Sequence, residues 1–436
     1  MKAGFWEPHV ELGSRKQLEE IQFRRAKETL HYVYNNSPFY KRKFDECGFD
    51  VGVFDSLSDF TRLPFTTKDD VRTAGFPFGG DFLCVPKRDL RLIHMTSGTT
   101  GNPMTGPYTT RDVENWTNLM ARNYVAAGVV PEDVIMNVYG YGLFTGGMGF
   151  HSAAELIGAC VIPWSVGKTE GLVKAMKDLG ATVMTGTPSY QLYILETAIK
   201  MGLDPAKDFD LRVSMPGAEI WDEGMRKRIE EGYGLRTKGG GSRNVYGATE
   251  LYGPGAGVEC EYESGFHFWT DHFYLEVVDP ETLEPVGPGE PGEIVVTTLT
   301  KQAMPLIRYR MRDITALDQD GCECGRNAFP KCLWVKGRLD DVIHYKGSKI
   351  WPSAVQDALL RFPEVREYRI EVDRDPLPYR FVINVELSSH DVPQSVKTRI
   401  LLELKKAIFV KFDLNFLEPG ALPRFEGKAK RVILNR

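Results

Sequence analysis

The chain has 436 residues, of which 42% are apolar and 26% are charged, and its formal net charge at pH 7 is -5. This length predicts two domains, and the acidic balance excludes a protein class that binds nucleic acid through a basic face. No apolar run approaches the ~18 residues of a membrane span, and residues 1–20 lack the apolar core of a secretion signal. We therefore expect a cytoplasmic protein with no membrane or nucleic-acid partner, and either a monomer or a homodimer.

The first part of the chain has the pattern of an α/β protein. A helix is predicted over 15–36, ended by the breaker cluster Asn35-Asn36-Ser37-Pro38. From residue 90, short β-branched runs alternate with helical stretches of about 10–15 residues, which predicts a parallel sheet covered by helices. The expected strands are 91–95, 134–140, 160–164, 181–187, 211–218 and 244–250, and the expected helices are 111–128, 150–159, 170–180, 190–202 and 223–234.

After residue 265 the pattern changes to that of an antiparallel β subdomain. Its expected strands are 273–279, 292–300 and 315–321. We place the end of a large N-terminal domain at residue 336 and interpret KGRLDD, residues 336–341, as the hinge into a small α+β domain, 337–436. That domain is expected to contain helices 353–362 and 395–408, strands 366–372 and 380–387, and the tail 426–433.

A loop rich in glycine and hydroxyl side chains lies between an expected strand and an expected helix. It reads Thr96-Ser97-Gly98-Thr99-Thr100-Gly101-Asn102-Pro103. Small residues let a backbone wrap closely round a ligand, and hydroxyl and N–H groups in a row suit phosphate oxygens. A glycine-rich surface turn is the alternative. A Walker loop is excluded, because the only candidate end, Gly167-Lys168-Thr169, has Ile162 where the first glycine is required.

This loop resembles the pyrophosphate-gripping loop of the adenylate-forming ligases, which include acyl-CoA synthetases, peptide-synthetase adenylation domains and luciferases. Further segments resemble that family's later motifs, in the same order along the chain. They are Gly217-Ala218-Glu219, Tyr246-Gly247-Ala248-Thr249-Glu250, Tyr309-Arg310-Met311-Arg312-Asp313, Gly337-Arg338-Leu339-Asp340-Asp341 and Gly427-Lys428. The resemblance spans roughly residues 90–430 and implies that the small domain acts as a lid.

The resemblance also assigns roles to these residues. Tyr246 would stack on adenine, and Thr249 and Glu250 would hold the α-phosphate and Mg²⁺. The Asp313 carboxylate would accept both ribose hydroxyls, unless it forms only a surface ion pair with Arg310 or Arg312. The nucleotide-binding set is then Thr96, Ser97, Gly98, Thr99, Thr100, Gly101, Gly217, Ala218, Glu219, Tyr246, Gly247, Ala248, Asp313 and Arg338.

The last two motifs carry the pivot and the catalytic lysine that the resemblance implies. Asp340 would be the hinge residue, although a plain charged linker is an alternative. The Lys428 ammonium would bridge the substrate carboxylate and the α-phosphate, and so stabilise the charge that develops during attack. Lys430, two residues further on, is the rival. Lys428, Thr249 and Glu250 are therefore the expected catalytic residues.

Four segments resemble phenylacetate–CoA ligases in particular, which implies an aryl acid substrate. They are 35–49, 139–147, 187–193 and 259–276. The expected aryl pocket consists of Tyr139, Tyr141, Gly142 and Phe144, with ordinary core rings as the alternative. The chain departs from the family at Asn102, where lysine is usual. Asparagine can still donate a hydrogen bond to phosphate, but without charge assistance.

Three of the seven cysteines lie near a histidine in the predicted β subdomain. Cys260, His267, Cys322 and Cys324 suit a tetrahedral Zn²⁺ ion, and some phenylacetate–CoA ligases have a structural zinc at matching positions. Three unligated loop cysteines are the alternative, and His272 is the reserve ligand. The other four cysteines are interpreted as small buried apolar residues.

Taken together, the motifs predict an ATP-dependent aryl acid–CoA ligase. It would form an acyl-adenylate and then an acyl-CoA thioester, releasing AMP and pyrophosphate, with MgATP and coenzyme A as substrates and a place in aromatic compound catabolism. Two alternatives stay open: an adenylyltransferase of the same family that does not use CoA, and a non-catalytic ligand sensor on the same fold. The sequence does not identify the acid.

Overall fold

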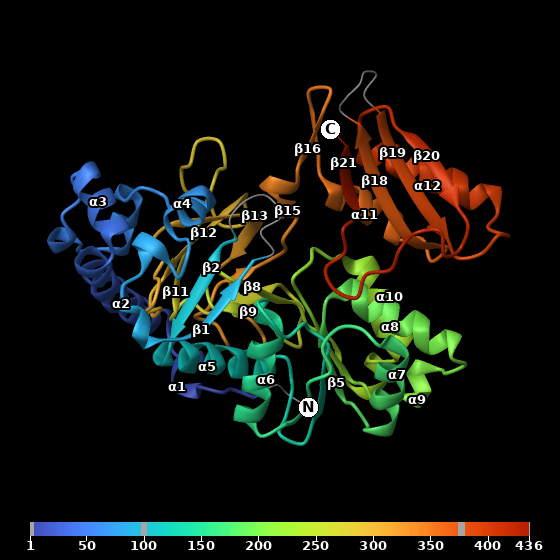
Figure 1. Cartoon of the computed structure of the whole chain (residues 1–436), viewed down its shortest axis with the longest axis horizontal. Coiled ribbons are helices and arrows are strands. Elements are labelled where there is room, and N and C mark those ends of the chain that lie inside the picture. The colour runs from blue at the N-terminus through green and yellow to red at the C-terminus, as the bar shows by residue number, and fades with distance from the viewer. Residues whose placement is uncertain (1–3, 97–102, 374–379, 436) are drawn as a thin grey trace.

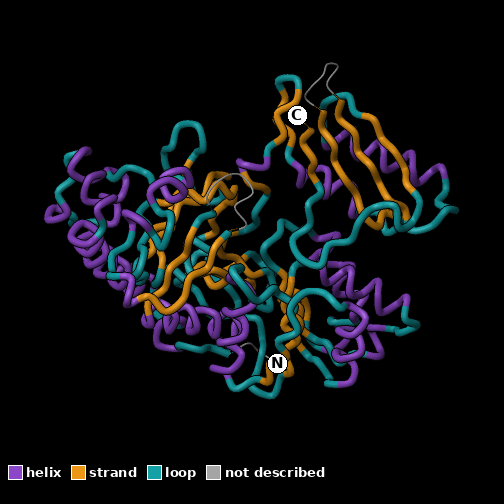
Figure 2. The backbone as a smooth tube through the Cα atoms, in the orientation of Figure 1, coloured by secondary structure: helices purple, strands orange, loops and turns teal. Residues whose placement is uncertain are grey.

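The computed structural model describes residues 4–96, 103–373 and 380–435. Within these residues the chain forms a large N-terminal part and a smaller C-terminal part that lies above it in Figure 1. Figure 2 shows strands in the middle of the large part and helices along its outer flanks. No helix among the described residues has both the length and the apolar character that crossing a membrane requires.

The N-terminal helices are set by local capping signals. Helix α2 (Arg15–Asn36) has the predicted bounds, because Ser14 and Gln17 form a capping box at its start and Ser37-Pro38 follow its end. The Ser37 hydroxyl accepts from the backbone N–H of Tyr40 and caps the next helix. The other helices of this region are α1 (Pro8–Glu11), α3 (Pro38–Cys47) and α4 (Lys68–Ala74).

A five-stranded parallel sheet with helices against it confirms the α/β prediction. Its strand order is β4-β3-β5-β6-β7, and every neighbouring pair is parallel. The strands are β3 (Val134–Asn137), β4 (Cys160–Ile162), β5 (Val183–Gly186), β6 (Val213–Pro216) and β7 (Gly241–Ser242). The helices of this region are α5 (Thr110–Ala126), α6 (Thr145–Ile157), α7 (Thr169–Asp178), α8 (Pro188–Lys200), α9 (Pro205–Asp208) and α10 (Glu223–Tyr233).

Two strands expected in the parallel series pair differently. Strand β1 (Leu90–Met95) forms an antiparallel pair with β2 (Thr105–Thr109), and β8 (Val245–Ala248) pairs antiparallel with β9 (Gly253–Glu259). The reason is the length of the connections. Residues 249–252 are too few for the crossover that a parallel pair needs, so β9 returns beside β8. The placement of 91–95 in the parallel sheet is therefore wrong, and 244–250 meets that sheet only through a parallel bridge between Val245 and Gly217.

The predicted β subdomain is an eight-stranded antiparallel sheet. Its order is β11-β12-β13-β14-β10-β9-β8, and β15 pairs with β13. Strand β13 begins at Tyr309, earlier than expected, so the motif 309–313 is itself part of a strand. The remaining strands are β10 (Phe266–Phe268), β11 (Phe273–Val278), β12 (Pro291–Thr298), β13 (Tyr309–Asp318), β14 (Lys331–Cys332) and β15 (Gly337–Arg338).

The C-terminal part has its own sheet and its own apolar core. The sheet order is β20-β19-β18-β21, and the segment between β20 and β21 reaches back to the large part near α10 (Figure 1). Strands β20 and β21 were not predicted. The elements are β16 (Ile343–Tyr345), β17 (Ser348–Ile350), β18 (Val365–Asp373), β19 (Arg380–Leu387), β20 (Asp413–Leu417), β21 (Val432–Asn435), α11 (Pro352–Leu360) and α12 (Gln394–Ala407). Short 3₁₀ helices span Val51–Val53, Leu57–Arg62, Gly80–Phe82, Lys87–Asp89, Arg236–Lys238 and Leu339–Asp341.

Two carboxylates face each other where α10 meets α11. Asp222 caps the N-terminus of α10, and Asp357 lies on α11. Burial, followed by the charge of Asp222, raises the pKa of Asp357 to about 6, while Arg361 opposes the shift. Because the folded protein then holds a proton that the unfolded chain releases, this pair lowers the free energy of unfolding as the pH rises from about 4 to about 6.

We expect Asp357→Asn to raise the unfolding temperature at pH 7–8, where the wild-type Asp357 carboxyl is ionised. The gain should shrink as the pH falls to 5, because the wild-type carboxyl takes up its proton there. Thermal unfolding at a series of pH values measures this difference. Asp391→Asn, a change at an exposed residue of the same part, is the matched control. A gain that does not depend on pH would contradict this explanation.

Candidate active site

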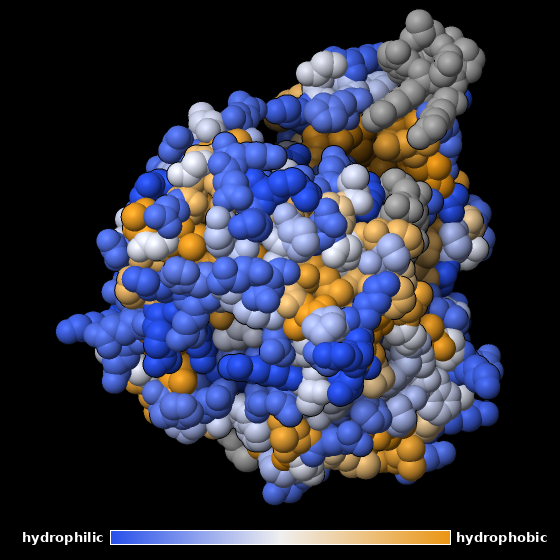
Figure 3. Space-filling view, turned by 60° about the vertical axis from the view of Figure 1, so that its left-hand side comes forward, coloured by the Kyte–Doolittle hydropathy of each residue, from blue (hydrophilic) through white to orange (hydrophobic). Residues whose placement is uncertain are grey.

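A cavity of about 760 Å³ lies between the two parts of the chain. Figure 3 shows a recess below the C-terminal part with apolar side chains in its wall. The cavity is lined by residues from five of the six predicted motifs, which are far apart in the sequence. These lining residues are Ala218, Glu219, Tyr246, Gly247, Asp313, Arg338, Asp340, Asp341 and Lys428. Gly217 and Ala248 directly adjoin them in the chain.

Asp313 lies at the centre of a buried polar group in this cavity. Tyr246 Oη donates to Asp313 Oδ2 at 2.6 Å, and Arg338 Nη1 lies 3.0 Å from Asp313 Oδ1. The backbone fixes the second contact, because Asp313 of β13 and Arg338 of β15 are paired in register. The phenol ring of Tyr246 stacks on Phe266, with ring centroids 5.0 Å apart. Burial raises the pKa of Asp313, and the charges of Arg338 and Lys428 oppose it.

The alternative in which Asp313 pairs with its neighbours in the motif is wrong. The guanidinium groups of Arg310 and Arg312 both contact Glu293 instead, with closest nitrogen–oxygen distances of 2.6 and 3.5 Å. Alternation along β13 explains this, because Arg310 and Arg312 share one face of the strand and successive side chains point to opposite faces. Asp313 is therefore free to face the cavity with Arg338.

Thr249 and Glu250 are buried beside this group, in the turn between β8 and β9. Tyr309 Oη donates to Glu250 Oε1 at 3.0 Å, which joins two of the predicted motifs. A lysine that the sequence did not single out supports the same turn: Lys301 is buried, and its Nζ donates to the backbone oxygens of Glu250 and Leu251. Burial lowers the pKa of Lys301 to about 8.

The glycine-rich loop is only partly described. Thr96 closes the β1–β2 pair, because its backbone N–H donates to Met104 O and its Oγ1 accepts from the Met104 N–H, both at 3.0 Å. The predicted phosphate-binding residues Ser97, Gly98, Thr99, Thr100 and Gly101, and the unusual Asn102, lie outside the described residues.

The C-terminal tail brings Lys428 to the cavity. Thr187 Oγ1 donates to Gly427 O at 3.1 Å, and the Ala429 N–H donates to a Glu219 carboxylate oxygen. Both Lys428 and its rival Lys430 line the cavity. The charge of Lys428 acts on the Asp313 carboxyl, which favours Lys428 as the lysine that faces Asp313 in the cavity.

Asp340 lies just after β15, on the large part's side of the lid. Its two oxygens contact Lys68 Nζ at 3.1 Å and Arg312 Nε at 3.3 Å. Although burial opposes the shift, these cations hold the pKa of Asp340 below its usual value. These ion pairs join the segment that contains Asp340 to α4 and β13. The role of Asp340 as a pivot stays a prediction.

The predicted aryl pocket residues lie around the start of α6. Tyr139 and Phe144 both approach Gly146, where an added Cβ would come within 2.7 Å of the Phe144 ring and 3.0 Å of the Tyr139 ring. The Tyr141 hydroxyl bonds to Asn137 Nδ2 at 2.7 Å and to His151 Nδ1 at 3.2 Å. Gly142 has a φ of 144°, which favours glycine.

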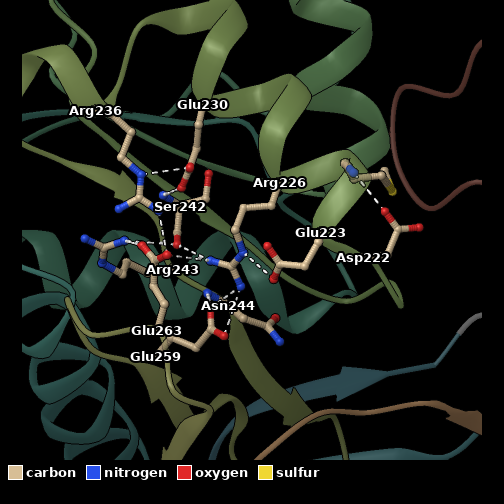
Figure 4. Close-up of polar contacts among 11 residues, drawn as sticks. Asp222, Glu223, Arg226, Glu230, Arg236, Ser242, Arg243, Asn244, Glu259 and Glu263 are labelled. Atoms are coloured by element: carbon tan, nitrogen blue, oxygen red, sulfur yellow. Dashed lines mark hydrogen bonds and ion pairs between the residues drawn. The ribbon is translucent and has the colours of Figure 1, made fainter. Parts of the chain in front are cut away.

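A network of ion pairs lies in the wall of the cavity that α10, β8 and β9 form. Arg226 of α10 contacts both oxygens of Glu259, at 3.0 and 2.9 Å, and the Asn244 N–H donates to Glu259 at 2.8 Å. Figure 4 shows Arg236 and Arg243 converging on Glu263 beside this group. Arg226, Asn244 and Glu259 also line the cavity. No pattern in the sequence singled these residues out, since charged residues of this kind are common on helices and strand ends.

The cysteine–histidine cluster assembles as predicted. Ligand atoms of Cys260, His267, Cys322 and Cys324 all lie within 4.8 Å of one another. Cys260 Sγ is 3.6 Å from Cys322 Sγ, and Cys324 Sγ is 3.3 Å from His267 Nε2. The reserve ligand His272 lies elsewhere, with its Nδ1 2.8 Å from Thr300 Oγ1.

The other four cysteines only partly fit their interpretation as small buried residues. Cys84 and Cys332 are buried, but Cys47 and Cys160 are exposed. Cys47 lies at the end of α3 and Cys160 begins the edge strand β4, where backbone position places the side chain on the outside.

Comparison with known proteins identifies the family. The AMP-binding enzyme family matches residues 48–301, and the AMP-binding enzyme C-terminal domain matches residues 347–436. The phenylacetate-coenzyme A ligase of Thermus thermophilus is 38% identical over 98% of this chain and 99% of its own length. The phenylacetate-coenzyme A ligase of Escherichia coli is 38% identical over 97% of this chain and 96% of its own length.

Solved structures agree with this result. 2-Hydroxyisobutyryl-CoA ligase in the postadenylation state, in complex with R3-HIB-AMP, has a TM-score of 0.90 and 27% identity, covering 98% of this chain and 92% of that chain. The same ligase in the thioesterification state, with 2-HIB-AMP and CoA, has a TM-score of 0.72 and 28% identity over the same shares. The resemblance drawn from the motifs is confirmed: the chain belongs to the AMP-binding enzyme family, in the branch that holds the phenylacetate–coenzyme A ligases.

Proposed function

We propose that the chain is an ATP-dependent aryl acid–CoA ligase that forms an acyl-adenylate and then an acyl-CoA thioester. The observation that carries this proposal is the meeting of five distant motifs of adenylate-forming ligases at one cavity between the two parts. The near full-length similarity to phenylacetate-coenzyme A ligases supports CoA as the acceptor.

The nucleotide would lie across the large part. Its base would contact Tyr246 and the backbone of 217–219, and its ribose hydroxyls would bond to Asp313. Each Asp313 oxygen already holds one protein partner but keeps a further lone pair for a hydroxyl. The triphosphate would extend to the 96–101 loop and Thr249. Glu250 would hold Mg²⁺, which would neutralise negative charge on the phosphate oxygens.

In the first step, a carboxylate oxygen of the acid attacks the α-phosphorus, and the bond to pyrophosphate breaks. Both reactants are anionic, so the Lys428 ammonium lowers the barrier by stabilising the charge that accumulates between them. In the second step, the CoA thiol attacks the acyl carbonyl of the mixed anhydride, AMP leaves, and the thiol proton passes to solvent.

A rearrangement of the lid between the steps is part of the proposal. The relative's two states give TM-scores of 0.90 and 0.72 to this chain, so the arrangement described here is more similar to that relative's postadenylation state. In this arrangement residues 428–432 of the tail line the cavity. Rotation of 337–436 about Asp340 would withdraw Lys428 and open a path for the thiol.

The aromatic rings around Gly146 support an aryl acid, with Tyr139 and Phe144 as the walls of its site. ATP–pyrophosphate exchange with a panel of phenylacetate, indoleacetate, benzoate and hydroxylated variants tests this proposal. Exchange that depends on one of these acids supports it, and no exchange with any of them contradicts it. Acid-dependent loss of free CoA thiol separates the ligase from an adenylyltransferase that does not use CoA.

We also propose a structural Zn²⁺ at Cys260, His267, Cys322 and Cys324. Tetrahedral zinc with sulfur ligands at about 2.3 Å and nitrogen at about 2.0 Å places ligand atoms about 3.5–3.8 Å apart. The distances of 3.6 Å between Cys260 and Cys322 and 3.3 Å between Cys324 and His267 are close to that geometry. Four protein ligands leave no open position, so the site would be structural.

A further inference from the structure

The large part holds the lysine-bearing tail at alternate residues. Gly427 O accepts from Thr187 Oγ1 at 3.1 Å, the Ala429 N–H donates to Glu219, and Arg431 Nη2 donates to Ser189 Oγ at 3.0 Å. These contacts fix the backbone on both sides of Lys428, through Gly427 and Ala429. Lys428 itself lines the cavity.

The Glu219 carboxylate makes the central contact between the large part and the tail. One carboxylate oxygen accepts from Ser189 Oγ at 2.6 Å and from the Ser189 N–H at 3.3 Å, and the other accepts from the Ala429 N–H. Ser189 lies in the first turn of α8, where the helix dipole favours a negative charge. The carboxylate is therefore anchored to the large part by one oxygen and binds the tail with the other.

The contact of the Glu219 side chain with the tail differs from the role that the resemblance gives to the backbone of the same motif. The family resemblance places the backbone of 217–219 beside the adenine, and Gly217 packs so closely on Val245 that an added Cβ would lie 2.5 Å from its carbonyl oxygen. Ala218, with a φ of 67°, turns the chain between the two. The segment thus faces the nucleotide cavity with its backbone and the tail with the Glu219 carboxylate.

We propose that Glu219 is the positioning residue of Lys428, and that it acts only in the lid arrangement in which the acid is adenylated. Its carboxylate fixes the peptide next to Lys428 through a charge-assisted hydrogen bond, which is stronger than a neutral one. Rotation of the lid breaks this bond, so Glu219 plays no part in thioester formation. This inference rests on the proposed ligase function.

The test compares the two half-reactions in Glu219→Ala and Glu219→Gln. We expect Glu219→Ala to lower acid-dependent ATP–pyrophosphate exchange roughly 10- to 100-fold, because a hydrogen bond to a charged group is lost. Thioester formation from preformed acyl-adenylate should stay within about twofold of wild type. Glu219→Gln keeps an acceptor for the Ala429 N–H and should lose less. Glu231→Ala, at an exposed carboxylate of α10, is the matched control and should change neither rate.

Two further measurements distinguish positioning from nucleotide contact and from misfolding. In a Lys428→Ala background, Glu219→Ala should cause no further loss of exchange, because the group that it positions is gone. The affinity for AMP, measured by calorimetry, should stay within about twofold. Equal loss of both half-reactions, an independent loss in the double variant, or a fall in AMP affinity would each overturn the proposal. Absence of exchange in the wild-type protein would instead be a failure of the ligase function itself.

Discussion

Replacing Lys428 by alanine is expected to lower acid-dependent ATP–pyrophosphate exchange about 10²- to 10³-fold, the range found when one preorganised electrostatic group is removed. Lys428 is held at the cavity by contacts on both neighbouring residues, Gly427 and Ala429. Thioester formation from preformed acyl-adenylate should be nearly unchanged, because the proposed rotation of the lid would turn this lysine away before that step. Stopped assays of the two half-reactions measure the split.

Lys430→Ala is the matched control, because Lys430 lines the same cavity two residues further along the tail. We expect Lys430→Ala to lower exchange by less than about tenfold, because the Lys430 ammonium would contribute only to the overall electrostatic potential of the site. A larger loss in Lys430→Ala than in Lys428→Ala would transfer the catalytic role to Lys430. Equal loss of both half-reactions in Lys428→Ala would contradict the rotation of the lid.

Local signals in the sequence were enough for α2, for the longer helices from α5 to α10 and for strands β3 to β6 of the parallel sheet, whereas α1, α3, α4, α9 and β7 were not predicted. Helix α2 has its predicted bounds because the capping box at Ser14 and Gln17 and the breaker at Ser37-Pro38 act over three or four residues. The alternation of β-branched runs and helices between residues 134 and 234 likewise reports the parallel sheet, since each connection is long enough for a crossover.

Pairing between distant segments was harder to predict. Strand β2 contains Gly106 and Pro107, which disfavour a strand, and it forms because β1 lies beside it. Strand β21 follows a basic tail and forms by parallel pairing with β18, where Val432 is in register with Ile370, some sixty residues earlier in the chain. The two β-branched residues of β21, Val432 and Ile433, are too short a run to assign a strand, and β2 has no such run, so tertiary pairing decides their structure.

The site shows the same division. The order of the motifs predicted that Tyr246, Asp313, Arg338 and Lys428 would meet, and all four line one cavity. The sequence could not assign the partner of each group. Asp313 bonds to Tyr246, and strand register brings it to Arg338. Glu219 bonds to a backbone N–H of the C-terminal part. A backbone donor has no signature in a sequence, because every residue except proline has one.

Removing one ligand of the cysteine–histidine cluster is expected to have the largest effect on stability. Cys322→Ser should lower the zinc content from one ion per chain to a trace, and should lower the unfolding temperature by roughly 5–15 °C, because binding of structural zinc contributes to the folding free energy. Metal analysis and thermal unfolding measure these changes. Cys47→Ser, at an exposed cysteine outside the cluster, is the control and should leave both values unchanged.

The effect should extend to the nucleotide cavity because the cluster and the cavity wall share a strand end. Cys260 directly follows Glu259, whose carboxylate bonds to Arg226 and to the Asn244 N–H in that wall. Tyr246 lies two residues after Asn244 in the chain. Loss of the metal should therefore weaken AMP binding as well as stability. Wild-type protein with only a trace of zinc, and with Cys260, Cys322 and Cys324 freely titratable, would rule out the metal. Unchanged AMP affinity in Cys322→Ser would show that the wall is rigid without it.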